Sequence, residues 1–300
     1  MSETETIEGT LEAHRVVAGD FFAIATMKTD NGPIACVGKF VGAKPGDSIE
    51  AEGFWNTHPT YGRQFKVSRV RVLTPQSDNG VIAWLTSRLP NIGEGRARAM
   101  LDHFDGVDGL WKCIEKTPER LSEVKGITSK RAEEIAEAYA AARHDRDAMI
   151  KLRRWGLTDY QISNALRAWI TAQDAVNEIG ANPYAMIEHV SGVGFLRADA
   201  IAQRMGIAPE DVARLRAGIT YTMQQATGHG HVYVSTGKLV AMSADKVLRV
   251  NGDLVAEQVA KMKKAGTFVQ HGKRTFARYL NNAERKCADK IRALLAQREE

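Results

Sequence analysis

The sequence has few cysteines, and this scarcity excludes two kinds of structure. Its 300 residues include only three, Cys36, Cys113 and Cys287, which are far apart and odd in number. Neither a disulfide framework nor a zinc ribbon fits this pattern, because both need cysteines in closely spaced sets. A reducing setting suits such a chain, so we expect a cytoplasmic protein.

Long hydrophobic runs and a leader-like N-terminus are also lacking. No apolar run approaches the roughly 18 residues that cross a bilayer. The opening MSETETIEGT is acidic and polar, unlike a secretory signal peptide. We therefore expect no membrane partner.

The chain has no nucleotide-binding loop of the form G-x-x-x-x-G-K-[ST], which holds a nucleotide phosphate and its magnesium. Gly38-Lys39, Gly237-Lys238 and Gly272-Lys273 all lack the Ser or Thr after Lys and the first Gly. We expect no ATPase activity from this chain alone, no catalytic residue and no cofactor. ATP and magnesium are expected only with a motor domain.

A metal site is not indicated either. His229 and His231 stand two residues apart in GHGHVY, but no Cys or carboxylate cluster adjoins them. Two ligands are too few for zinc, so a role in a turn is the favoured interpretation.

Charge is present but unevenly distributed. The net charge is +5, yet residues 1–60 hold nine acids against four bases, whereas residues 261–298 hold eleven bases against two acids. A basic segment suits a polyanion, because Lys and Arg release counterions from phosphates. The alternative is a solvated helix face that only aids solubility, and the charge pattern alone does not decide between them.

Residues 6–73 contain five strand-like runs. Turn residues separate them, such as Asp30-Asn31-Gly32 and Lys44-Pro45-Gly46-Asp47. Five short strands of this kind predict a small closed barrel, most often an OB-fold. The alternation in KVSRVRV predicts that Val67, Val70 and Val72 face inward.

Aromatic side chains on the predicted barrel suggest a second kind of contact. Trp55, Tyr61 and Phe65 are candidates for stacking on the bases of a single strand. Each of them instead fills the core if it points into the barrel, and for any single one the core is the favoured interpretation.

From about residue 80 the pattern becomes helical and repeats itself. LPNIGEGRARAM, LSEVKGITSKRAEEI and IEHVSGVGFLRADAIA each place a glycine turn between two helical runs. Gly93, Gly126 and Gly192 are spaced 33 and 66 residues apart, and a weaker copy with Gly156 lies in the gap. Such a period indicates a repeated unit, here a helix-hairpin-helix.

Each turn followed by a helix predicts a phosphate contact. The first N–H groups of a helix have no internal partner, and the helix dipole adds partial positive charge there. Glycine permits a turn conformation that is costly for other residues, and it leaves room for the phosphate. A basic residue early in the helix reaches the same or the next phosphate.

The candidate contacts are Ile92, Gly93, Gly95, Arg96 and Arg98 in the first hairpin; Lys125, Gly126, Ile127, Ser129, Lys130 and Arg131 in the second; and Gly192, Val193, Gly194 and Arg197 in the third. Such contacts fix a position on the backbone and read no sequence. Close packing of two helices uses the same glycines, and this alternative weighs most heavily for the apolar third hairpin.

The last part of the chain has the outline of a winged helix. After a helix and the break GHGHVYVS come two helical runs and the strand pair TFVQHGKRTFARYL, with Lys273 and Arg274 as further DNA contacts in its turn. The fold class is therefore α+β and mostly helical. We expect an OB-like barrel at 1–75, tandem helix-hairpin-helix units at 76–145, a second pair at 146–206 and a basic winged-helix-like segment at 207–300.

Several of these stretches resemble the N-terminal region of the long, stand-alone RecD-like DNA helicases. They are GFWNTHPTYGRQFKV, LPNIGEGRARAM, LSEVKGITSKRAEEI, NPYAMIEHVSGVGFLRADAIA and GHGHVYV, in matching order and spacing. The resemblance implies a region that binds single-stranded or forked DNA ahead of an ATP-driven 5′ to 3′ motor, in recombination and repair. Since no motor follows in this sequence, we expect a separated or truncated N-terminal half, or a product that lost its motor.

Other interpretations stay open. A junction-binding protein resembling RuvA, which recruits a separate motor, accounts for residues 1–145 but not for the rest. An enzyme such as a glycosylase would use Asp199, although that position also suits a helix cap or an ion pair. A scaffold would dock a motor domain or a single-strand-binding protein. For the favoured interpretation we expect a monomer with DNA as its partner.

Overall fold

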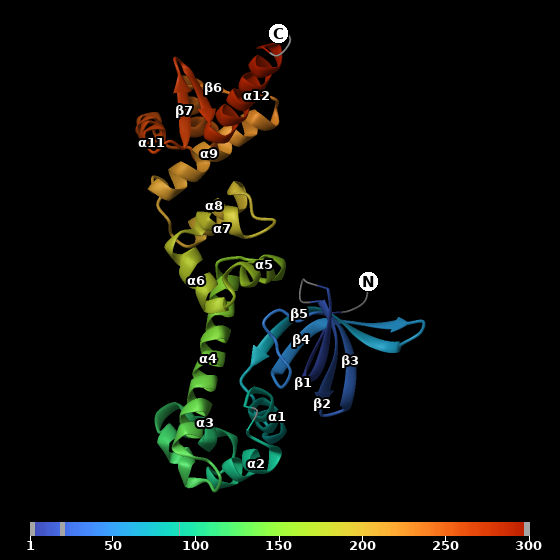
Figure 1. Cartoon of the computed structure of the whole chain (residues 1–300). Helices are drawn as coiled ribbons and strands as arrows, with labels where there is room; N and C mark the ends of the chain where they lie inside the picture. The colour runs from blue at the N-terminus through green and yellow to red at the C-terminus, as the bar shows by residue number, and fades with distance from the viewer. Residues whose placement is uncertain (1–3, 19–21, 90, 297–300) are drawn as a thin grey trace. The chain divides into compact units, whose positions relative to one another are not determined.

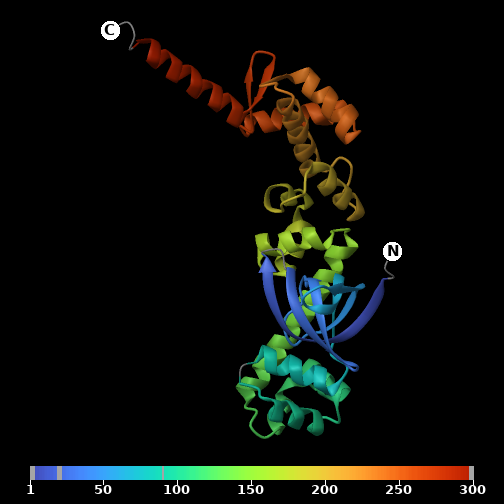
Figure 2. The same cartoon turned by 90° about the vertical axis from the view of Figure 1, so that its right-hand side faces the viewer.

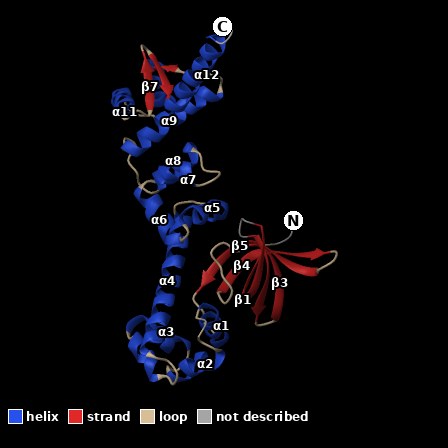
Figure 3. Ribbon diagram, viewed as in Figure 1, coloured by secondary structure: helices blue, strands red, loops and turns tan. Residues whose placement is uncertain are grey.

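The computed structural model describes residues 4–18, 22–89 and 91–296. The chain divides into two compact units, Met1–Asn177 and Glu178–Glu300. Strands occur at two places, a barrel near the N-terminus and a small sheet near the C-terminus, and helices form most of the remainder (Figure 3).

The first unit begins with a closed five-stranded barrel (Figure 1). Its strands are β1 (Glu5–Ala18), β2 (Phe22–Thr29), β3 (Gly32–Lys39), β4 (Ser48–His58) and β5 (Gly62–Leu73). Their order around the barrel is β1-β2-β3-β5-β4, and the β3–β5 pair is the parallel one. The predicted OB-like barrel is confirmed.

Alternation along the strands fills the barrel core, with one irregularity. Leu11, Met27, Ile49 and Phe65 are fully buried at its centre. In β5 the register shifts opposite Glu52 and Gly53, and this bulge changes the alternation. Because of it, Val67 and Val70 both face inward although they are three residues apart.

A helical core follows the barrel in the same unit. It consists of α1 (Asp78–Arg88), α2 (Glu94–His103), α3 (Val107–Lys116), the 3-10 turn η1 (Pro118–Glu123) and the first half of α4 (Ser129–Arg154). Their apolar faces share one cluster, in which Trp84 and Trp111 lie edge to face at 5.6 Å. The turn η1 and helix α3 contact α4, and with α1 and α2 they form the cyan-to-green group of helices at the bottom of Figure 2.

The 26-residue helix α4 crosses the boundary that the sequence suggests at residues 145 and 146. It leads into α5 (Asp159–Trp169) and α6 (Ala172–Ala181). The four-part division of the chain stays a prediction. The boundary between the two compact units falls within α6, after Asn177.

The second unit starts with the third hairpin. It contains the 3-10 turn η2 (Pro183–Ala185), α7 (Met186–His189) and α8 (Phe195–Arg204). Tyr184 and Phe195 stack at 6.2 Å between ring centroids, and Phe195 in turn stacks on Tyr221 at 5.2 Å. The hairpin is thus packed onto the helix that follows it.

The rest of the unit has the connectivity of a winged helix. The elements are α9 (Val212–Gly228), β6 (Val234–Ser235), α10 (Thr236–Ala241), the π-helical η3 (Met242–Leu248), α11 (Gly252–Lys264), β7 (Phe268–His271), β8 (Arg274–Ala277) and α12 (Arg278–Ala296). Strand β8 lies between β6 and β7, and both pairs are antiparallel. This order confirms the predicted outline, with the β7–β8 hairpin as the wing.

Candidate nucleic-acid interface

Each hairpin ends at the N-cap of the helix behind it. These N-caps are Gly93 for α2, Thr128 for α4, Thr158 for α5 and Gly194 for α8. The residue before each N-cap is apolar and buried: Ile92, Ile127, Leu157 and Val193. An apolar residue anchored in the core therefore holds each turn, and the first amides of the next helix follow directly.

This register corrects the period expected from the sequence. Gly93 is equivalent to Thr128, not to Gly126, so the units repeat at intervals of 35, 30 and 36 residues. The interval varies because the connections between the units differ in length. The side chains of Ile92, Ile127 and Val193 are core residues, so only their backbone is available to a ligand.

The glycines of the hairpins serve two different purposes. Gly126, Gly156 and Gly192 have φ values of +90°, +90° and +81°, which favour glycine. Gly93 and Gly194 have φ values of −87° and −94°, which any residue adopts. The expectation that these two positions need glycine for their backbone conformation is therefore wrong. A methyl group at either of these two would meet no atom within 4 Å. The space in front of their helices is open.

The hairpins differ in how many helix amides remain available. In the described part of the chain, no side chain caps α2 or α8. By contrast, Thr128 Oγ1 accepts a hydrogen bond from the Arg131 amide of α4, at 3.3 Å. Around the Gly156 turn, Thr158 and Gln161 form a reciprocal capping box. The first and third hairpins thus leave the most helix amides available to a ligand, and the Gly156 turn leaves the fewest.

Basic side chains surround the first two hairpins. Arg96 Nη1 donates to the Asn91 carbonyl oxygen at 2.7 Å, and Arg131 Nη1 donates to the Gly126 carbonyl oxygen at 2.9 Å. Arg131 also lines a hollow of about 300 Å³ together with Asn91 and Ile92, so the two hairpins are neighbours. Lys125 and Lys130 are exposed beside them.

One candidate, Arg98, carries less free charge than the sequence suggests. Arg98 is in an ion pair with Glu94, one turn away on α2, at 2.7 Å. In the third hairpin, Arg197 is exposed, but its neighbour Leu196 is an apolar side chain with 64% of its surface exposed. The positive charge is therefore concentrated at the first two hairpins.

The three aromatic candidates on the barrel lie in different environments. Phe65 is completely buried, so its candidacy for base stacking is wrong, and it fills the barrel core as the favoured interpretation predicts. The guanidinium carbon of Arg63 lies 4.0 Å from the ring centroid of Trp55, so it covers the ring. The indole N–H of Trp55 donates a hydrogen bond to Glu5 Oε2 at 3.0 Å. Tyr61 is 71% exposed in the turn between β4 and β5, so its ring is accessible.

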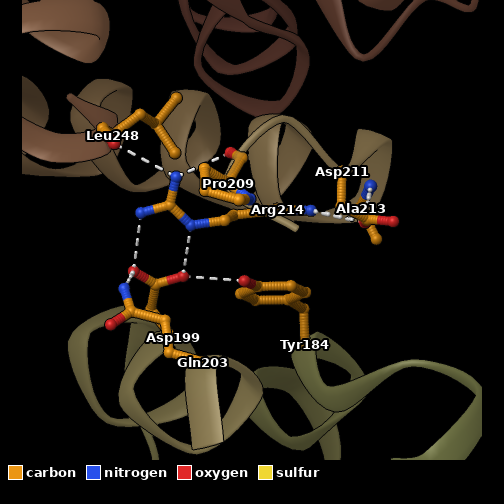
Figure 4. Close-up of polar contacts among 8 residues, drawn as sticks. All are labelled: Tyr184, Asp199, Gln203, Pro209, Asp211, Ala213, Arg214 and Leu248. Carbon is orange, nitrogen blue, oxygen red and sulfur yellow. Dashed lines mark hydrogen bonds and ion pairs between the residues drawn. The ribbon is translucent and has the colours of Figure 1, made fainter. Parts of the chain in front are cut away.

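Asp199 lies in a buried polar network of the second unit (Figure 4). Its carboxylate accepts hydrogen bonds from the Tyr184 hydroxyl at 2.7 Å and from Arg214 Nε and Nη2 at 2.8 and 3.0 Å. Gln203 donates a fourth, at 3.0 Å. The ion pair considered from the sequence is present, and a carboxylate with these four donors is poorly suited to be a glycosylase base.

Arg214 links the third hairpin to the winged helix. Its Nη1 donates to the carbonyl oxygens of Pro209 at 2.8 Å and Leu248 at 3.1 Å. The hydrogen bonds to Asp199 raise the pKa of Arg214, and burial raises the pKa of Tyr184, so both remain protonated as donors. The network joins α8, the connection to α9 and the end of η3.

Residues 4–18, 22–89 and 91–296 contain no group of three or more His, Cys, Asp or Glu side chains placed to hold a metal ion. None of the helices described in those ranges is long and apolar enough to cross a membrane. His229 Nδ1 is within 2.7 Å of the Gln225 carbonyl oxygen, at the end of α9.

An OB barrel followed by helix-hairpin-helix units defines a class of nucleic-acid-binding modules. Comparison with known families agrees along the chain. Residues 4–75 match the OB-fold domain of the ATP-dependent DNA helicase YrrC, residues 85–140 match a SAM-like helix-hairpin-helix tandem, and residues 141–233 match the HHH domain of the ATP-dependent RecD2 DNA helicase.

Individual relatives point the same way. The ATP-dependent RecD2 DNA helicase of Deinococcus radiodurans is 27% identical over 302 residues, which cover 91% of this chain and 40% of that protein. UvrABC system protein C of Desulfatibacillum aliphaticivorans is 45% identical over 53 residues, which cover 18% of this chain and 8% of that protein. The resemblance to the N-terminal region of the RecD-like helicases is confirmed, and the chain spans about two fifths of the RecD2 relative.

Proposed function

We propose that this chain is the DNA-binding N-terminal module of a RecD-like 5′ to 3′ helicase in recombination and repair. It grips single-stranded or forked DNA through backbone phosphates and acts without a nucleotide, metal or cofactor of its own. One observation carries the proposal: the N-terminus of α2, which no side chain caps, is open to solvent and lies beside the exposed side chains of Lys125 and Lys130 in the second hairpin. Helix amides with nearby Lys and Arg are a phosphate site.

The hairpin contacts in this proposal are largely made by the backbone. The amides of Gly93 and Gly95 in the first hairpin, Ser129 in the second and Gly194 in the third donate hydrogen bonds to phosphate oxygens. Arg96, Lys125, Lys130, Arg131 and Arg197 supply charge to the same strand. Arg98 contributes less, because Glu94 already neutralises it.

A RuvA-like junction protein is less consistent with these findings. That interpretation covers residues 1–145, whereas the RecD2 family match extends over 141–233. A four-way junction bound more tightly than a fork, by a tetramer in light scattering, would favour it. We expect a monomer and a preference for forks or single strands.

Fluorescence anisotropy with labelled oligonucleotides tests the proposed function. The full chain is expected to bind a single strand or a fork at low salt, and the logarithm of its affinity should fall linearly with the logarithm of the salt concentration. Absent binding at low salt, or binding that salt does not weaken, would overturn the proposal.

Tyr61 gives a prediction about the barrel. Replacing Tyr61 by Ala should weaken the binding of a single strand by about 1 kcal/mol or more, because one base loses its stacking partner. The free energy of unfolding should not change, since the ring is exposed. Phe65→Ala should instead destabilise the chain by about 3–5 kcal/mol.

Tyr160→Ala is the matched control, because Tyr160 is also an exposed tyrosine but lies on α5 outside the barrel. Its binding of a single strand should equal that of the unchanged chain. Equal losses from Tyr61→Ala and Tyr160→Ala would show that Tyr61 has no special role.

A further inference from the structure

The wing of the second unit lies in a segment without negative charge. From Gln258 to Ala283 the sequence has six bases, Lys261, Lys263, Lys264, Lys273, Arg274 and Arg278, and no Asp or Glu. The wing itself, β7 and β8 with their turn, falls within this stretch. Both Lys273 and Arg274 are exposed at its turn. The family matches end at residue 233, before the wing begins.

The third helix of the winged helix, α11, has a different surface. Its first two turns expose Asp253 and Glu257, and Glu257 forms an ion pair with Lys261 at 2.7 Å. Negative side chains at the start of a helix repel the phosphates that flank a DNA groove. The charge on α11 therefore opposes insertion of its N-terminal end into a groove, while the wing has no such obstacle.

The wing is held firmly on the unit. Lys263 Nζ donates to Thr236 Oγ1 at 3.0 Å and to Gln270 Oε1 at 2.9 Å, which joins α11 to both α10 and β7. The Thr236 amide donates to the Lys273 carbonyl oxygen at 3.1 Å. These bonds fix the turn that presents Lys273, so little order would be lost when a phosphate binds there.

Arg274 is also positioned in advance. Its guanidinium lies 4.8 Å from the ring centroid of Tyr233, which packs on Phe276 at 5.4 Å. A guanidinium resting on an aromatic ring keeps its N–H edges free for phosphate oxygens. Arg274 and Lys273 thus present two cations next to each other on a fixed β-turn.

We propose that the winged helix binds a run of DNA backbone phosphates with its wing, through Lys273 and Arg274, and that α11 does not enter a groove. This inference rests on the proposed DNA-binding function of the chain, but it concerns a surface separate from the hairpins. Both single strands and duplexes carry the phosphate chemistry that the wing recognises.

The test uses the full chain and two variants with opposite expectations. Lys273→Ala with Arg274→Ala removes the wing charges. This variant should bind DNA about tenfold more weakly, and the slope of log affinity against log salt should be smaller by about two units. Ala256→Glu with Ala260→Glu adds acids to the exposed face of α11. It should change the affinity by less than about twofold, because charges away from the bound phosphates are screened.

Anisotropy with a labelled single strand and a duplex of the same sequence gives the readout, and the two probes show which form the wing prefers. If the double wing variant has a lowered melting temperature, Lys273→Glu alone replaces it in the binding measurement, because Lys273 is exposed in the turn. Unchanged binding by the wing variants, or a strong loss from the α11 variant, would overturn the inference. In either case the unchanged chain still binds in a salt-dependent way, so the proposed function stands; it fails if that chain does not bind at low salt or if salt does not weaken its binding.

Discussion

Arg214→Met is expected to destabilise the second unit by about 3–5 kcal/mol, because it leaves the buried Asp199 carboxylate without its cationic partner. The same change removes the hydrogen bonds to the Pro209 and Leu248 carbonyl oxygens. All five tryptophans lie in the first unit, so their fluorescence reports on that unit alone. In urea, the circular dichroism transition should move to lower concentration while the tryptophan transition stays.

The double variant Arg214→Met with Asp199→Leu is the control for this prediction. Replacing both members of a buried ion pair by apolar side chains is often neutral or stabilising. The double variant should therefore be more stable than Arg214→Met alone. If the two are equally unstable, the uncompensated charge of Asp199 is not the cause, and the lost bonds to Pro209 and Leu248 account for the effect.

Lys125→Ala with Lys130→Ala is expected to weaken DNA binding about tenfold in moderate salt, because two phosphate contacts lose their charge. Both side chains are exposed at the second hairpin, so the melting temperature should not change. The matched control is Lys112→Ala with Lys116→Ala on α3, which removes the same charge from exposed positions outside the turns. It should leave the affinity within about twofold, because screening weakens distant charges.

The barrel and the hairpins could be predicted from the sequence because local rules determine them. Turn residues separate the five strands, and alternation places Phe65 and Val67 inside the barrel. The same alternation speaks against base stacking by Phe65. The register of the hairpins was harder to predict, because a glycine such as Gly126 is needed for its backbone angle, whereas Gly93 is an N-cap with ordinary angles.

The contacts that depend on the tertiary fold could not be predicted. Arg214 is 15 residues from Asp199, and its other partner Leu248 is 34 residues further on, so no local pattern connects them. The bulge in β5 is likewise visible only from the pairing with β4. The ion pair of Arg98 with Glu94 had a local signal, since oppositely charged residues four apart on a helix are neighbours.

The salt dependence of DNA binding tests the central claim that the hairpins bind backbone phosphates. It is measured by anisotropy for the unchanged chain, for Lys125→Ala with Lys130→Ala, and for Lys112→Ala with Lys116→Ala. The hairpin variant should lower the slope of log affinity against log salt by about two units, roughly one for each lost contact, and the α3 variant should leave it unchanged. Equal slopes for all three proteins would contradict the claim.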